Sequence, residues 1–213
     1  FDFVTKNLGI TTLVESAKSA KGDTLTDLSI SSLALGGPTY GLTVKEMTAA
    51  YATFGNLGKY WKPVTYLKIE DQDKNIVLQQ QEEPGRAMGE DTANIMNEML
   101  QTVVRGSSGT GRGAAFGNWP IYGKTGTTSN NKDIMFYGGT PYYIAGVWFG
   151  FDTPREMKGI SSSHTAAIWK NVMSEIHKNL KLRDFPESSL VSYRRYCTST
   201  GLLATNRCPS TSP

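Results

Sequence analysis

The chain has 213 residues, of which 38% are hydrophobic and 19% are charged. This composition is typical of a globular protein with one sizeable core or two small ones, and it excludes disorder over most of the chain. The net charge is only +3 and no run of like charges occurs, so nothing indicates a nucleic-acid or membrane-surface partner. Gly and Pro interrupt the longest uncharged stretches, and no secretory signal is present. Because residue 1 is Phe, we interpret the sequence as a piece of a longer protein.

The first third of the chain predicts one strong helix. Residues 1–9 resemble the end of a short helix that stops at Gly9, and a polar, loop-rich stretch then runs to about residue 36. Thr43 and Glu46 form a capping box at the start of a helix over 42–58, which Gly55 and Gly58 can end. Its apolar face has helical spacing and consists of Met47, Ala50, Tyr51 and Phe54.

A hairpin and a second helix follow. Residues 64–80 alternate, turn at Asp71 to Asn75 and alternate again, which is typical of a β-hairpin. Residues 90–106 predict a helix that Asp91 can cap and that Gly106 ends. We expect its buried stripe to consist of Ile95, Met99 and Val103.

The last part of the chain predicts a small sheet and a closing helix. After a Gly-rich loop, strands are expected at 121–127, 134–138 and 143–149, and the loops of several residues between them favour antiparallel pairing. Residues 162–180 predict a helix with a stripe of Ile168, Val172, Ile176 and Leu180. The order of these elements predicts an α+β fold with an antiparallel sheet. From residue 183 the Ser-, Thr- and Pro-rich sequence indicates an extended tail or linker.

Residues 121–130, "IYGKTGTTSN", allow two interpretations. Gly-Lys-Thr ends a phosphate-binding P-loop, but five residues instead of four separate Gly117 from Gly123, and "GTTSNN" does not begin a helix. A second Gly cluster has Arg112 where a P-loop needs Lys. The alternative is the Lys-Thr-Gly motif of β-lactamases and penicillin-binding proteins.

The second interpretation extends over most of the chain. The stretches "LGGPTYGLTVKEMTAAYATFGNLGKYWKPVTYLKI", "GSSGTGRGAAF", "KDIMFYGGTPYYIAGVWFGFD" and "AAIWKNVM" all resemble class A, bifunctional penicillin-binding proteins. The resemblance implies the penicillin-binding protein/serine β-lactamase-like transpeptidase fold, of which only the C-terminal portion is present. It covers residues 1–182 as part of a transpeptidase domain, and residues 183–213 more loosely as a tail.

The resemblance implies acyl transfer without a cofactor or metal. In this family a serine attacks the D-Ala-D-Ala end of a peptidoglycan stem peptide, and an amine of a second stem peptide then accepts the acyl group. β-Lactams resemble the substrate and trap the serine. The implied partners are stem peptides, β-lactams and the upstream part of the same protein, with a glycosyltransferase domain. The implied location is the extracellular or periplasmic side of a bacterial membrane in which the full-length protein is anchored.

The motif assigns roles to four consecutive residues. Alternation along a strand places Lys124 and Gly126 on one face, and Thr125 and Thr127 on the other. The resemblance implies that Lys124 supplies positive charge for the substrate carboxylate, and that the hydroxyls of Thr125 and Thr127 contact this carboxylate. The backbone N–H of Thr127 is expected to form half of an oxyanion hole. Gly126 allows a ligand to lie flat against the strand.

Two family motifs are missing from their expected places. Ser-x-x-Lys, which carries the nucleophile, and Ser-x-Asn each occur once, and both begin at Ser129, three residues after Gly126. A serine on that connection cannot easily face Lys124 across a cleft. We therefore expect the nucleophile outside this chain and no activity from this chain alone. An upstream strand is expected to pair along 143–149.

Two other functions remain open from the sequence. One is a D,D-carboxypeptidase or β-lactamase, which rapid hydrolysis of the acyl-enzyme would reveal. The other is a non-catalytic penicillin-sensing module, which would bind β-lactam without turnover.

The remaining notable side chains have simpler interpretations. His164 and His177 are expected at the surface, and Trp119 in packing or in a cleft wall. Cys197 and Cys208 either form a small disulfide loop, which we expect in an exported protein, or remain free thiols.

Overall fold

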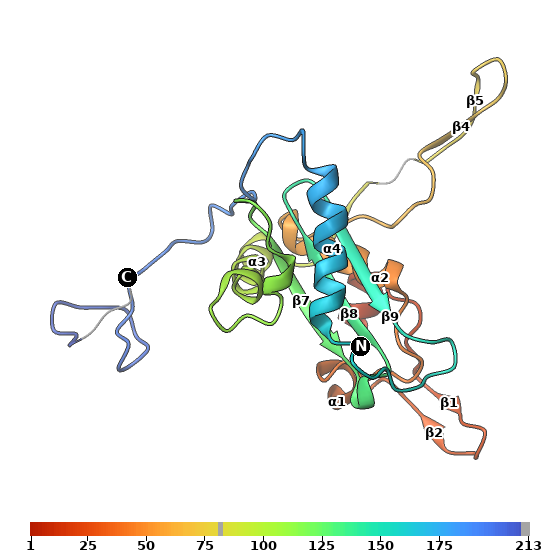
Figure 1. The fold of residues 1–213 in the computed structure, drawn as a ribbon, viewed down its shortest axis with the longest axis horizontal. Coiled ribbons are helices and arrows are strands. Elements are labelled where there is room, and N and C mark those ends of the chain that lie inside the picture. The colour runs from red at the N-terminus through yellow and green to blue at the C-terminus, as the bar shows by residue number, and fades with distance from the viewer. Residues whose placement is uncertain (81–82, 210–213) are drawn as a thin grey trace.

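A computed structural model describes residues 1–80 and 83–209 of the protein. At its centre is an antiparallel sheet with the strand order β7-β8-β9 (Figure 1). The strands are β7 (Tyr122–Thr127), β8 (Ile134–Gly139) and β9 (Ile144–Phe149). The three expected strands and their antiparallel pairing are therefore confirmed, with ends within one residue of the prediction.

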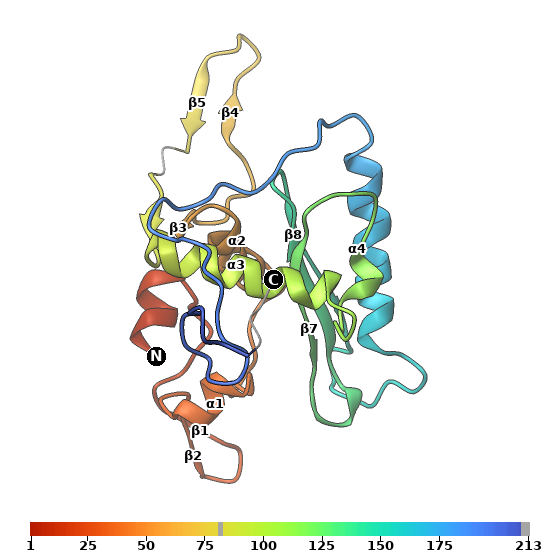
Figure 2. The ribbon, with the colours of Figure 1, turned by 90° about the vertical axis from the view of Figure 1, so that its left-hand side faces the viewer.

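Helices cover both faces of this sheet, as Figure 2 shows. Helix α4 (Ser162–Ile176) lies on one face, where Trp169 meets Phe136 of β8 with 5.4 Å between ring centroids. Helix α2 (Val44–Gly55) lies on the other face, where Tyr51 stacks on Tyr137. Since neighbouring residues of a strand point to opposite faces, Phe136 and Tyr137 fix this layered arrangement. Helix α3 (Glu90–Arg105) lies beside α2 and packs against β7.

The main core lies between the sheet and α4. The Trp169 indole N–H donates to the backbone oxygens of Gly138 and Ala145, both at 3.1 Å, so one side chain fixes α4 to β8 and β9. The buried cluster around it consists of Val104, Ala114, Ile121, Phe136, Ala166, Trp169 and Met173.

Helix α2 forms where its local signals predict. Thr43 and Glu46 make both hydrogen bonds of the capping box. The chain leaves the helix through Gly58, whose φ of +81° and close approach to the Met88 oxygen leave no room for a side chain. Of the expected apolar face, Ala50 is buried, whereas Met47, Tyr51 and Phe54 are half-buried.

Two expected helix stripes are wrong. In α3, Ile95 and Met99 are 49% and 58% exposed, and the buried face consists of Ala93, Asn94, Asn97, Leu100 and Val104. In α4, Ile168, Val172 and Ile176 are all more than 40% exposed, and Thr165, Ala166, Trp169 and Met173 are buried instead. The N-cap of α3 is Gly89, so Asp91 is not the cap residue.

Smaller elements surround this body. The expected hairpin is present as β4 (Lys68–Glu70) and β5 (Ile76–Gln79), with every strand residue exposed, and it projects from the body in Figure 1. The expected N-terminal helix is a π-helix, η1 (Phe3–Asn7). The polar stretch before residue 36, which was expected to be a loop, contains a hairpin and a short helix: β1 (Ala17–Lys18), β2 (Thr24–Leu25) and α1 (Ile30–Ala34). A further strand pair consists of β3 (Lys59–Tyr60) and β6 (Gly85–Arg86). Two 3₁₀ turns are η2 (Arg112–Ala114) and η3 (Ser129–Asn131).

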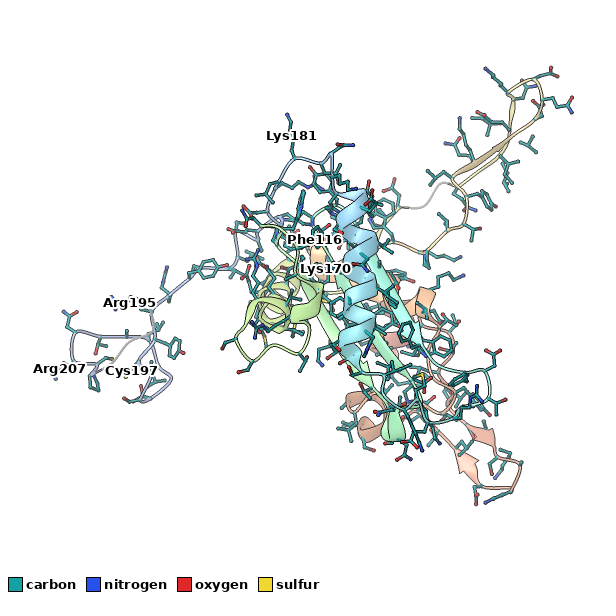
Figure 3. All side chains as sticks on the ribbon, viewed as in Figure 1. Phe116, Lys170, Lys181, Arg195, Cys197 and Arg207 are labelled. Carbon is teal, nitrogen blue, oxygen red and sulfur yellow. The ribbon has the colours of Figure 1, made fainter. Side chains whose placement is uncertain are left out.

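The C-terminal segment has two parts. The first part contacts the body: the Phe185 ring lies 5.4 Å from that of Tyr122, the Ser188 N–H donates to Asn94 Oδ1 at 2.6 Å, and Tyr193 interacts with Glu98 of α3. Beyond it, the segment that carries Arg195, Cys197 and Arg207 lies away from the body (Figure 3). The expected disulfide is absent, since Cys197 and Cys208 are both free thiols. The domain boundary at residue 182 stays a prediction.

The two histidines differ. His164 is exposed, as expected, and its ring takes part in the capping box of α4. His177 was expected at the surface, which is wrong: it is 3% exposed. Its ring lies within hydrogen-bonding distance of the Thr140 hydroxyl and of the Met173 oxygen, and Trp119 packs against it. Buried hydrogen bonds at the end of α4 therefore hold the residue in place.

Candidate active site

The Lys-Thr-Gly-Thr segment forms the second half of β7. Lys124 lies opposite Tyr137 of β8, Thr125 opposite Phe136, and Gly126 opposite Met135. Because Tyr137 faces α2 and Phe136 faces α4, Lys124 and Thr125 extend from opposite faces of the strand. The expected alternation of the four residues thus agrees with the register.

A buried tyrosine fixes the start of this strand. The Tyr122 side chain is 1% exposed, and its hydroxyl donates to the Tyr51 backbone oxygen at 2.9 Å. A Cβ on Gly139 would come within 2.7 Å of the Tyr122 hydroxyl, so this glycine makes room for the ring. Burial raises the pKa of Tyr122, which stays a neutral hydrogen-bond donor. The sheet and α2 therefore hold β7 rigidly before the motif begins.

The outer edge of β7 is open. In the part of the chain that the structure describes, β8 is the only strand that pairs with β7. The Thr128 N–H donates to the Asp133 oxygen at 2.9 Å and so points toward the β8 side. Since successive N–H groups of a strand point to alternate edges, the Thr127 N–H points to the open edge. This is the orientation that a backbone oxyanion donor needs.

Lys124 lies at the same edge. Its side chain is exposed, and its ammonium donates to the Thr125 backbone oxygen at 2.9 Å. No described carboxylate forms an ion pair with it. The positive charge is therefore available to an anionic group that approaches the edge of β7.

The Thr125 hydroxyl has a neighbour from outside the strand. Its Oγ1 lies 2.8 Å from Oγ1 of Thr110, which belongs to the Gly-rich loop after α3. Thr110 was not predictable as a site residue, because a side-chain contact across 15 positions leaves no local pattern in the sequence. The only hint was the placement of this threonine between two glycines in "GTG".

Gly126 faces the Met135 side chain. A Cβ at this glycine would come within 2.7 Å of Met135 Cγ, so a side chain here would have to displace the methionine. The Met135 side chain therefore fills the space beside Gly126, and the expectation that a ligand lies flat against the strand here stays a prediction.

Ser129 follows the strand in the 3₁₀ turn η3 and is exposed. Asn130 and Asn131 have left-handed backbone angles, with φ of 59° and 50°. Ser129 and Lys132 therefore do not lie one turn apart on a regular α-helix, as a Ser-x-x-Lys nucleophile motif requires. The expectation that Ser129 is not the nucleophile stays a prediction that this geometry favours.

Two surface hollows lie away from the motif. One, of about 350 Å³, lies between the loop around Trp119 and the end of α4. The other lies between α3 and residues 184–187. Among the described residues, no group of three or more His, Cys, Asp or Glu side chains could hold a metal, and no helix is long and apolar enough to cross a membrane.

A family model and several known proteins match this chain. The family model described as the penicillin binding protein transpeptidase domain matches residues 5–155. Penicillin-binding protein 1A of Clostridium perfringens is 36% identical over 174 residues, which are 81% of this chain and 20% of that protein. Penicillin-binding protein 1A of Clostridium tetani is 34% identical over 197 residues, which are 90% of this chain and 25% of that protein. The chain thus spans about a fifth to a quarter of the length of these relatives.

Solved structures share the fold. Penicillin-binding protein 1A from Haemophilus influenzae matches with a TM-score of 0.70 at 20% identity, over 85% of this chain and 33% of that one. PonA1 from Mycobacterium tuberculosis matches with a TM-score of 0.61 at 24% identity, over 70% of this chain and 42% of that one. These likenesses confirm the α+β fold that the sequence predicted.

Proposed function

The chain belongs to the family of penicillin-binding protein transpeptidase domains, and we propose that it forms the C-terminal part of a peptidoglycan D,D-transpeptidase. The observation that carries the proposal is the open edge of β7. An ammonium, two threonine hydroxyls and an unpaired backbone N–H occupy one short strand there. A substrate that ends in a carboxylate and carries a reacting carbonyl needs this set of groups.

The chemistry divides between this chain and the rest of the protein. A serine outside this chain attacks the carbonyl of the penultimate D-Ala, the terminal D-Ala leaves, and an acyl-enzyme forms. The amine of a second stem peptide then attacks the ester, which makes the cross-link and releases the serine. The Thr127 N–H stabilises the negative charge that develops on the carbonyl oxygen. Lys124 and the Thr125 and Thr127 hydroxyls bind the terminal carboxylate, and Gly126 lets the peptide lie against the strand.

The relatives' greater length supports the assignment of partners. The upstream part of the same protein supplies the nucleophile and, as in bifunctional class A proteins, a glycosyltransferase domain. The ligands are stem peptides and the β-lactams that resemble them. A membrane anchor in the full-length protein holds this domain on the extracellular or periplasmic side of the bacterial membrane.

The test is acylation of the complete protein by a labelled penicillin. Lys124→Ala removes the ammonium at the β7 edge, and we expect acylation to slow by at least about a hundredfold, the usual effect of losing one preorganised electrostatic group. Lys170→Ala is the matched control, because Lys170 lies on α4 (Figure 3) and should leave the rate unchanged. Ser129→Ala should change the rate by no more than a few-fold.

Two results would contradict the assignment. Wild-type acylation in the Lys124→Ala protein would show that the β7 edge does not bind the ligand. Complete loss of labelling in Ser129→Ala would show that the nucleophile lies in this chain after all.

A further inference from the structure

The Thr110 side chain makes a polar contact with the Thr125 hydroxyl of the Lys-Thr-Gly-Thr segment. Thr110 lies in the loop between α3 and η2, is exposed, and has its hydroxyl oxygen 2.8 Å from that of Thr125. No other hydrogen bond involves the Thr110 side chain among the described residues. The single polar partner of this hydroxyl is therefore a side chain of the proposed carboxylate-binding strand.

The loop holds Thr110 firmly at this place. Glycines flank it, and a Cβ on Gly109 would come within 2.3 Å of the Val103 oxygen. The Gly111 N–H donates to that same oxygen at 2.9 Å, and a Cβ on Gly111 would come within 3.0 Å of the Phe136 ring. The two glycines thus let the backbone lie directly on the last turn of α3 and against the core. Thr110 is fixed by a rigid loop and not by its own side-chain packing.

The chemistry of two neighbouring hydroxyls gives this contact a direction. Each hydroxyl has one hydrogen and two acceptor lone pairs, so only one of the pair donates to the other. If Thr125 is to donate to a ligand carboxylate, its own hydrogen must be free, and Thr110 must be the donor between them. The Thr110 hydroxyl hydrogen then bonds to a lone pair of the Thr125 oxygen and fixes the Thr125 rotamer. The hydroxyl hydrogen of Thr125 stays free to bond to a ligand.

We propose that Thr110 is a positioning residue that orients the Thr125 hydroxyl toward the carboxylate of the ligand. The proposal rests on the proposed function, since it requires a carboxylate ligand at the edge of β7. Thr110 itself does not touch the ligand. Its effect should appear in the affinity of the first, non-covalent complex and not in the acylation step, because carboxylate binding is the same before and during the attack on the carbonyl.

The experiment uses the complete protein and two probes, benzylpenicillin and its methyl ester, which lacks the free carboxylate. Three variants are compared with the wild type. Thr110→Val keeps the shape and removes the hydroxyl, and Thr110→Ser keeps the hydroxyl. Thr102→Val is the matched control, because the exposed Thr102 hydroxyl donates only to the Met99 oxygen in its own helix. For each protein, the dissociation constant of the non-covalent complex and the limiting acylation rate are measured separately.

We expect Thr110→Val to weaken binding of benzylpenicillin about tenfold, the effect of one neutral hydrogen bond, with less than about a twofold change in the limiting rate. The same substitution should change binding of the methyl ester less than about twofold. Thr110→Ser and Thr102→Val should both bind benzylpenicillin as the wild type does. In a Thr125→Val protein, adding Thr110→Val should have no further effect, because the hydroxyl to be oriented is already gone.

Several outcomes would overturn the proposal. Unchanged or tighter binding of benzylpenicillin by Thr110→Val would mean that Thr110 does not direct the Thr125 hydrogen to the ligand. An equal loss for the acid and the ester, or a loss of the folded state, would mean a structural role. A wild-type protein that benzylpenicillin does not acylate would instead refute the proposed function itself, and the two failures are therefore distinguishable.

Discussion

Glu46 offers the sharpest test of how the N-terminal segment is held to the body. The side chain is the third residue of α2 and is only 8% exposed. Its Oε1 accepts from the Thr11 N–H at 2.7 Å and from the Thr11 hydroxyl at 2.8 Å. Its Oε2 accepts from the Thr43 N–H and hydroxyl and from the Thr12 hydroxyl. One carboxylate thus caps a helix and joins the chain before it to that helix.

These hydrogen bonds determine the charge state of the carboxyl. Burial alone would raise the pKa of Glu46, but the donors of Thr11 and Thr43 outweigh burial and lower the pKa from 4.5 to about 2. The difference between these values corresponds to about 3 kcal/mol of folding free energy at neutral pH, at about 1.4 kcal/mol per pKa unit. That is a large share of the usual net stability of a domain.

The perturbation is Glu46→Gln in the complete protein, measured by urea unfolding. The Gln amide cannot accept all five hydrogen bonds, and its NH₂ group would face the N–H and hydroxyl donors of the threonines. We therefore expect the free energy of unfolding to fall by about 3 kcal/mol at neutral pH. Because the folded pKa lies below the unfolded one, the wild type keeps its full advantage above pH 4.5 and loses it as the pH falls toward 2. At about pH 3.5 the difference between wild type and variant should already be smaller by about 1.4 kcal/mol.

Glu175→Gln is the matched control. Glu175 is exposed on α4 and pairs only with Lys178, so its substitution should change the unfolding free energy by less than about 1 kcal/mol at any pH. A loss below about 1 kcal/mol for Glu46→Gln, or a difference that stays constant from pH 7 to pH 3.5, would contradict this role of the Glu46 carboxylate.

Two further predictions concern the Cys197 thiol and the stability of the isolated chain. Hydrogen bonds from the Thr200 and Cys208 side chains lower the pKa of Cys197 to about 7, so the ultraviolet absorbance of its thiolate, which needs no reagent to reach the buried sulfur, should rise with pH through about 7. A rise centred near 9 would contradict this cause. Residues 1–213 expressed alone should aggregate, because among the described residues only β8 pairs with β9, and Ile168, Val172 and Ile176 of α4 are exposed. A soluble monomer with a sharp melting transition would show instead that the piece is self-sufficient.

Local signals predicted the elements well. The capping box of α2 and the turn at Asp71 to Asn75 rely on hydrogen bonds between residues at most four apart, so the sequence contains the whole interaction. The three strands were found because the segments are rich in β-branched and aromatic residues and the breaks between them contain turn-forming residues such as Asn130 and Pro141. The Lys-Thr-Gly-Thr motif was found for the same reason, since it is contiguous.

The buried faces of α3 and α4 were not predictable in this way. Periodicity assumes that the large apolar side chains of a helix face the core. In α3 the buried positions include Asn94 and Asn97, whose partners are Ser188, 94 positions away, and the Phe54 oxygen, 43 positions away. Polar residues with such distant partners resemble surface residues in the sequence. His177 was misplaced for the same reason, because Thr140 lies 37 positions away.

The two edges of the central sheet differ in chemistry, and this difference suggests what each one is for. An open strand edge is an aggregation hazard unless charge or cover protects it. At the β7 edge Lys124 binds the outward-pointing Thr125 oxygen, so a charged side chain protects the strand while a ligand is absent. An anionic ligand can displace that bond and keep the ammonium as its partner. The β9 edge has no such device, since Ile144–Phe149 contains no charged residue and Trp148 is 39% exposed. A polar ligand therefore suits β7, and we propose that a strand from the upstream part of the protein pairs with β9.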